Sequence, residues 1–243
     1  VNMPPKKRLK GEDGEAVDQD EAEEAVMDGA TAQLAATPKS GGFSSYAPSY
    51  EGASGAETEE DAKEDTRKQL SAQASFQAPD TTLNVMVGTT GNILMTLNEG
   101  GLHYLYAGAR ANVGIRSGRY MFEVRVIELL NQTDTGMQLR IPGPKHLLRI
   151  GFSTGKCSPI MGDTEDSICF DSSGAVLFNR RQLSMTGKFL HDCTLAVVLN
   201  LDAESPNSNS MSLFKDGRRQ GPPQQLPESL QGKVLFPTLT YKN

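Results

Sequence analysis

Arginine, tyrosine and asparagine side chains gather in one short stretch of the chain, and these residue types are well suited to recognising a partner. Arg110 lies between Ala109 and Ala111, and we expect it in a turn between two strands, with an accessible guanidinium. A guanidinium can hold a carboxylate through two parallel hydrogen bonds, so it is a specific contact for an acidic group. In the alternative, Arg110 braces the sheet by donating to backbone carbonyls. The other candidate binding residues are Tyr104, Tyr106, Asn112, Arg116 and Arg119.

A compact basic cluster stands near the start of the chain. It consists of Lys6, Lys7, Arg8 and Lys10, preceded by two prolines. Such a cluster is typical of a nuclear-import signal or a nucleic-acid contact. The alternative is a solvated charge run that no receptor recognises. We expect import, and therefore a nuclear protein.

Residue patterns of the common catalytic and metal sites are absent from the sequence. There is no phosphate-binding G-x-x-x-x-G-K-[ST] run and no G-x-S-x-G nucleophile turn. His103, His146 and His191 lie far apart. The cysteines, Cys157, Cys169 and Cys193, are odd in number and lack metal-ligand spacing, so we expect three free, buried thiols. We therefore predict no enzyme activity, no catalytic residue, no metal and no cofactor.

We expect two kinds of small charged motif to be solvent-exposed surface features. Asp163, Glu165 and Asp166 form a short acidic loop, but a calcium site needs about six oxygen ligands. The pairs 180–181 and 218–219 are adjacent arginines beside turns. We expect solvated hairpin ends there, with phosphate contact as the alternative.

Composition divides the 243 residues into an acidic tail and a nearly neutral remainder. Residues 1–79 hold 8 Lys/Arg and 16 Asp/Glu, whereas residues 80–243 hold 16 and 14, a net charge of +2. The tail has few large aliphatic residues, so we predict that 1–79 is disordered, with a short helix at 57–70 as an alternative within it. The neutral remainder argues against nucleic-acid binding by bulk charge. No apolar run approaches the roughly 18 residues of a membrane span, and no signal peptide is visible.

Short β-branched and aromatic runs alternate with turn signals throughout 80–243. The clearest is 119–127, where Tyr120, Phe122, Val124 and Val126 fall on one face of a strand. No stretch has a convincing helical period. The pattern predicts an all-β, antiparallel two-sheet β-sandwich. Its expected strands are 83–87, 93–97, 102–107, 119–127, 146–153, 167–170, 175–179, 194–200, 210–214 and 235–241.

Turn chemistry supports this segmentation. Asp216-Gly217 follows an expected strand and predicts a tight hairpin, and the run 171–174 (DSSG) predicts another. The segment 129–145, with two glycines and two prolines, predicts a long loop between two strands. Long loops on a rigid sandwich are common binding surfaces.

Five motifs in register over about 160 residues resemble a SPRY domain. They are 108–114 (GARANVG), 117–124 (SGRYMFEV), 149–153 (RIGFS), 213–217 (LFKDG, with Gly221 beyond) and 235–237 (LFP). The resemblance implies a bent, concanavalin-like two-sheet sandwich spanning 80–243. Phe152 stands where most members have Trp, and Asp216 replaces the usual Asn. Members continue past the position of Asn243 into a last strand, so we expect this domain to lack it.

Within the family, the run 104–111 (YLYAGARA) is most similar to the heterogeneous nuclear ribonucleoprotein U branch. This resemblance implies a non-enzymatic protein-interaction module in a nuclear ribonucleoprotein setting. The resemblance implies that the partner is a short protein segment docked in the loops at one end of the sandwich. Some of the segments that bind the resembling domains are acidic. Alternatives are direct RNA or DNA binding through basic segments, a SPRY subunit of a chromatin-modifying complex, and a ubiquitin-ligase adaptor. RNA association would be indirect or through regions absent from this chain, and no membrane partner is expected.

Overall fold

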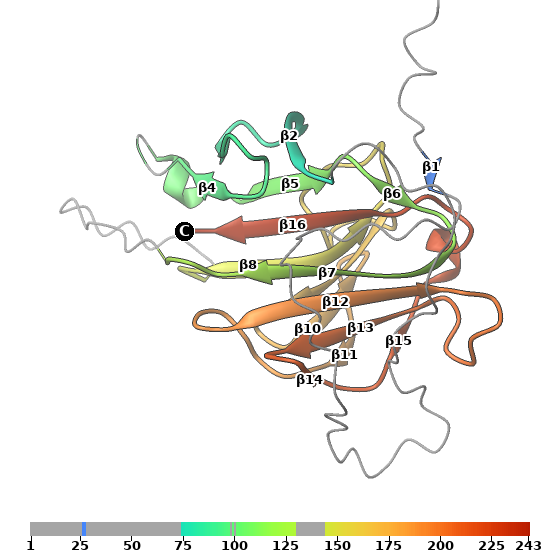
Figure 1. Ribbon diagram of the computed structural model, residues 1–243. Helices are drawn as coiled ribbons and strands as arrows, with labels where there is room; N and C mark the ends of the chain where they lie inside the picture. Colours follow the sequence, from blue (N-terminus) through green and yellow to red (C-terminus); the bar gives the residue numbers. More distant parts are fainter. Residues whose placement is uncertain (1–25, 28–73, 98, 100, 130–143) are drawn as a thin grey trace, which may run out of the picture.

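The computed structural model describes residues 26–27, 74–97, 99, 101–129 and 144–243 (Figure 1). Across these residues the chain forms β-strands and two short 3-10 turns, η2 (Leu102–Tyr104) and η3 (Glu228–Leu230), and no α-helix. The basic cluster 6–10, the suggested helix 57–70 and the centre of the loop 129–145 lie outside the described residues.

The larger sheet has seven strands, each antiparallel to its neighbours. The strand β16, last in the chain, lies inside this sheet between β8 and β5, and β2 pairs with the other side of β5, so both ends of the folded region belong to one sheet (Figure 1). In spatial order the strands are β11 (Arg181–Met185), β10 (Ala175–Phe178), β9 (Ser167–Asp171), β8 (Leu147–Ser153), β16 (Phe236–Lys242), β5 (Ala107–Ala111) and β2 (Phe76–Thr81).

The second sheet has five strands and is also antiparallel. Its order is β14 (Arg218–Arg219), β13 (Ser210–Lys215), β12 (Thr194–Leu201) and β7 (Gly118–Arg125), with β15 (Gln224–Gln225) pairing with β13 as well. The strand β7 therefore stands at one edge of this sheet. Two small pairs complete the fold: the hairpin β3 (Val85–Val87) with β4 (Leu94–Thr96), and β1 (Val26–Met27) parallel to β6 (Gly114–Ile115).

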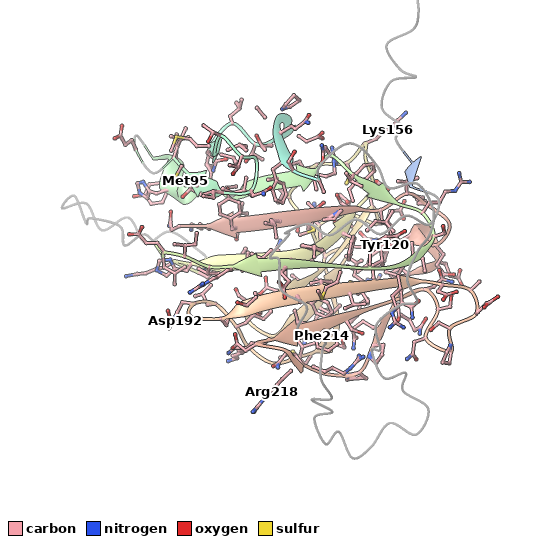
Figure 2. The ribbon with its side chains drawn as sticks, viewed as in Figure 1. Met95, Tyr120, Lys156, Asp192, Phe214 and Arg218 are labelled. Carbon is pink, nitrogen blue, oxygen red and sulfur yellow. The ribbon has the colours of Figure 1, made fainter. Side chains whose placement is uncertain are left out.

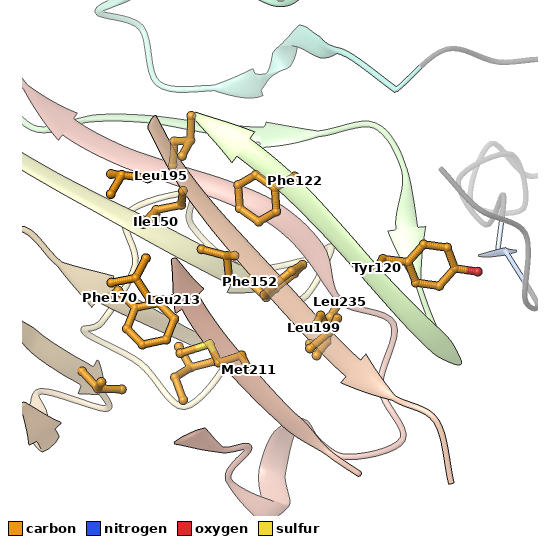
Figure 3. Packing of buried hydrophobic residues seen from close by; sticks show 14 of the residues in the cluster. Tyr120, Phe122, Ile150, Phe152, Phe170, Leu195, Leu199, Met211, Leu213 and Leu235 are labelled. Atoms are coloured by element: carbon orange, nitrogen blue, oxygen red, sulfur yellow. The ribbon is translucent and has the colours of Figure 1, made fainter. Parts of the chain in front are cut away.

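Both sheets send alternate side chains into one shared core (Figure 3). The rings of Phe122 on β7 and Phe152 on β8 meet edge to face, with their centroids 5.4 Å apart. Fully burying each such side chain stabilises the fold by about 1.5–3 kcal/mol. The core also includes Ile150, Phe170, Val176, Leu195, Val197, Leu199, Met211, Leu213 and Leu239. The predicted all-β antiparallel sandwich is thus the observed architecture.

The strand 119–127 has the orientation that its alternation predicts. Tyr120 and Phe122 are buried in the core and Val124 packs against it, whereas Glu123 and Arg125 are exposed. The predicted Asp216-Gly217 hairpin also forms, because Lys215 pairs with Arg218 across it and both turn residues have positive φ. Two consecutive positive φ values match the right-handed twist of a hairpin.

The predicted strand 102–107 is wrong. Residues 102–104 form the 3-10 turn η2, and the N-cap residue Gly101 before it has φ of 87°. The strand is instead β5, which includes Arg110, a residue that the sequence predicts in a turn. Its small side chains are what the packing requires, because a Cβ added to Gly108 would lie 2.7 Å from the carbonyl oxygen of Pro159.

The folded region begins before the predicted boundary at residue 80. The strand β2 starts at Phe76 and pairs with β5 through Phe76↔Ala111 and Thr81↔Ala109. The strand β11 was also missed, since it is mostly exposed and lacks a buried alternating face. Neither strand has the apolar pattern that marks a core strand in sequence.

Candidate functional site

Arg110 does not lie in a turn, and its guanidinium is not accessible. It belongs to β5, and its side chain is 9% exposed. Nη1 donates to the carbonyl oxygens of Thr154 at 2.9 Å and Cys157 at 2.7 Å, and Nη2 donates to Asp80 Oδ1 at 2.6 Å. The expected turn position and exposure are therefore wrong. The contacts are those of the bracing alternative, in which Arg110 donates to backbone carbonyls.

The other five predicted binding residues do not surround Arg110. Tyr104 and Tyr106 precede β5, whereas Arg116 and Arg119 follow β6, at the other end of the β5–β6 segment. All five occupy partly or fully exposed positions, and the guanidinium of Arg149 lies 5.7 Å from the ring centroid of Tyr106. Asn112 accepts a hydrogen bond from the Ser75 backbone at 2.9 Å, which links β5 to the chain before β2. The six predicted binding residues therefore do not form one cluster, because some lie before β5 and others after β6.

A different part of the described surface is hollowed and apolar. It is a cavity of about 540 Å³ between the end of β7 and the β3–β4 hairpin, which we call the β7 groove. Its floor comes from the seven-stranded sheet and its walls from β7 and β4. The apolar lining residues include Phe76, Leu94, Phe122, Val124, Val126, Leu147, Leu148, Leu190, Leu239 and Tyr241.

The lips of the β7 groove carry exposed apolar side chains. Met86 and Met95 pair across the β3–β4 hairpin and are 41% and 47% exposed. Ile93 is 47% exposed on the same hairpin, and Ile127 is 78% exposed beyond the end of β7. Met95 lies at the end of the sandwich where β16 terminates (Figure 2). Contiguous exposed apolar surface of this kind marks an interaction site more often than a random surface.

One polar atom in the floor is unsatisfied. The hydroxyl of Tyr241 is buried and has no hydrogen-bond partner among the described residues. Burial raises the pKa of Tyr241 above its usual value, so the phenol stays neutral at physiological pH. The charged groups around the groove are mixed in sign, with Glu123 and Arg125 on β7 and Lys242 donating to the Pro144 carbonyl at 3.1 Å.

Sequence reasoning missed this groove, although one signal pointed to it. The apolar alternation of β7 continues through Val126 beyond the last paired residue, Arg125. Because β7 has no pairing with β12 beyond Arg125, the apolar side chain that follows must pack against another part of the fold or against a partner. The exposed methionines of the hairpin gave no such signal, because single exposed apolar residues are common.

Chemistry at the remaining titratable groups is limited. Within the described ranges, no group of three or more His, Cys, Asp or Glu side chains could hold a metal ion. Burial raises the pKa of the Cys169 thiol to about 12, and it also raises the pKa of the Cys193 thiol. All three cysteines are free, with Cys169 and Cys193 buried and Cys157 only partly so. In the predicted acidic loop, Asp166 meets Lys233 at 3.5 Å, while Asp163 and Glu165 are exposed.

None of the helical turns in the described part of the chain has the length and apolar character needed to cross a membrane. No protein-family model matches the chain. Among solved structures, the chain is similar to the SPRY domain of human HERC1, with 18% sequence identity and a TM-score of 0.49. That similarity covers 69% of this chain and 89% of the other.

Proposed function

We propose that this protein is a non-enzymatic interaction module that binds a segment of a partner protein in the β7 groove. The observation that carries the proposal is the combination of an apolar cavity of about 540 Å³ with the exposed side chains of Met86, Ile93, Met95 and Ile127 on its lips. Burying those side chains against a partner would be favourable by about 25 cal/mol for each Å² of apolar surface removed from water.

A polypeptide fits these features better than a small molecule. Met86, Met95 and Ile127 belong to the cavity lining but are 41–78% exposed, so a compact ligand on the floor would leave much of their surface in water. A chain segment lying along the groove would cover both lips. Methionine side chains also adapt to the shape of a bound peptide, which is why they are common on binding surfaces.

This proposal retains the protein-interaction function predicted from the sequence but places the docking site in the β7 groove. The sequence placed peptide docking around Arg110, but that guanidinium already has three partners inside the protein. The nuclear location, the ribonucleoprotein setting and the acidic character of the partner remain predictions from the sequence and its resemblance. Direct RNA binding through basic segments remains the alternative function.

The test uses the full chain, immobilised and panned against a random peptide library. We expect selected peptides to bind wild type and to lose at least tenfold in affinity against Met95→Asp and against Ile127→Asp. Met185→Asp is the matched control, because Met185 is 58% exposed on β11, at the opposite edge of the larger sheet from β2. Equal binding by all three variants, or no selected peptide at all, would reject the β7 groove as the docking site. Retention of nuclear-extract proteins that ends with ribonuclease treatment would favour RNA instead.

A further inference from the structure

The β7 groove is bordered by an unpaired strand edge. The strand β7 pairs with β12 along its whole length, from Thr194↔Arg125 to Leu201↔Gly118. On its other side, no strand of the described chain pairs with it. We propose that the partner segment binds as an added antiparallel or parallel β-strand on this edge. This inference rests on the proposed function and specifies its binding mode.

The backbone of β7 supplies hydrogen-bonding groups for such a strand. In an edge strand, every second residue directs its N–H and C=O away from the existing neighbour. The five residues Met121–Arg125 of β7 span about 17 Å, so they offer main-chain hydrogen bonds to a segment lying beside them. Main-chain pairing of this kind gives affinity, and the pockets for alternate side chains give specificity.

The inner face of β7 determines which side chains of the partner segment can face the cavity. Phe122, Val124 and Val126 line the groove, with Leu94 of the hairpin also in the lining. A strand beside β7 would direct every second side chain into the cavity. Those side chains must be large and apolar to fill about 540 Å³ without leaving a void.

The same cavity argues against a second copy of this chain as the occupant. If two copies paired edge to edge through β7, the inward residues of the incoming strand would be its own Phe122 and Val124. These side chains already pack in the core of their own molecule. They could not also enter the cavity of another. The groove therefore fits an extended segment of a partner whose side chains are not already packed elsewhere.

The outer face of β7 dictates the charges of the partner. Glu123 and Arg125 are both exposed on this face, two residues apart. Opposite charges directly across two strands stabilise their pairing, and like charges oppose it. The matching segment has a basic residue opposite Glu123 and an acidic residue two positions away, opposite Arg125. Its pattern is thus large apolar residues alternating with one basic and one acidic residue.

Hydrogen exchange and backbone methylation test the pairing. With a library-selected peptide bound to the full chain, we expect slower amide exchange in Met121–Arg125. We also expect an alternating response to single N-methylation along the peptide. Methylation at residues whose N–H faces β7 should weaken binding at least tenfold, and methylation at the residues between them should have little effect. A peptide that binds without protecting β7 and without this alternation would overturn strand addition, while the docking function itself would stand.

A charge exchange tests the register. Glu123→Arg should weaken the selected peptide at least tenfold, and replacing the basic residue of the peptide by Glu should restore affinity. Glu204→Arg makes the same charge change on an exposed loop and should leave affinity unchanged. Unaltered melting temperature would show that each variant is folded. If the peptide with Glu did not regain affinity for Glu123→Arg, the proposed register would be wrong. If amide exchange in β7 slowed when the protein self-associated without peptide, the edge would belong to an interface with a second copy.

Discussion

Arg110 and Asp80 form a short ion pair, with 2.6 Å between Nη2 and Oδ1, across the neighbouring strands β5 and β2. The same guanidinium holds the Thr154 and Cys157 carbonyls, which belong to the connection between β8 and β9. One side chain thereby joins β5 and the edge strand β2 to the connection between β8 and β9. A residue with these contacts stabilises the fold whether or not it also meets a partner.

Replacing Arg110 by Ala should lower the free energy of unfolding by about 3 kcal/mol, because the part-buried carbonyls of Thr154 and Cys157 lose their donor. The measurement is urea denaturation of the full chain. Asp80→Asn is the control for the ion pair alone, since the Asp80 side chain is 39% exposed and such pairs contribute less than about 1 kcal/mol. If Arg110→Ala lost peptide binding at an unchanged melting temperature, the residue would belong to the binding surface after all.

The contrast between Phe122 and Arg110 shows how far the sequence could predict this structure. The alternation around Phe122 predicts its strand and its buried face, because a period of two is a local property of the chain. Arg110 depends on Asp80, Thr154 and Cys157, up to 47 residues away. Its flanking alanines gave a false signal of exposure, whereas they are small because neighbouring strands and loops pack closely there. The β7 groove also depends on distant residues, because it forms where two sheets and a hairpin meet; the sequence signals only its β7 wall, through the apolar alternation that continues to Val126.

Gly151 on β8 pairs with Cys169 on β9, and the backbone of β9 leaves no room there for a side chain. A Cβ added there would overlap the Ile168 carbonyl oxygen and lie 2.7 Å from Cys169 Cα. Gly151→Ala should therefore destabilise the protein by about 3 kcal/mol, seen as a lower denaturation midpoint. Gly217→Ala separates backbone strain from crowding, because Gly217 has φ of 75° and nothing within 4 Å of an added Cβ. It should cost only about 1–2 kcal/mol, and an equal loss in both variants would contradict the crowding argument.

The buried thiol of Cys169 should make the protein sensitive to alkali. Burial raises its pKa from 9.0 to about 12, so the folded state keeps a proton that the unfolded state releases between these values. The contribution of this thiol to the free energy of unfolding is therefore fully present below about pH 9 and is lost as the pH rises toward 12. Chemical denaturation across this range should show a steeper decline for wild type than for Cys169→Ala, whose packing loss is the same at every pH. Parallel curves would show that the thiol does not contribute.

The basic cluster at 6–10 should direct the protein to the nucleus. Lys7→Ala with Arg8→Ala removes two of its four charges, so an import receptor that recognises clustered cations should no longer bind. The readout is the nuclear fraction of the chain fused to a carrier too large to diffuse through nuclear pores. Arg180→Ala with Arg181→Ala is the matched control, because it removes two adjacent positive charges from an exposed hairpin. We expect nuclear accumulation to fall severalfold in the first variant and to persist in the second. An unchanged distribution in the first would leave 6–10 as a solvated charge run, and loss in the second would place the recognised cations on the sandwich instead.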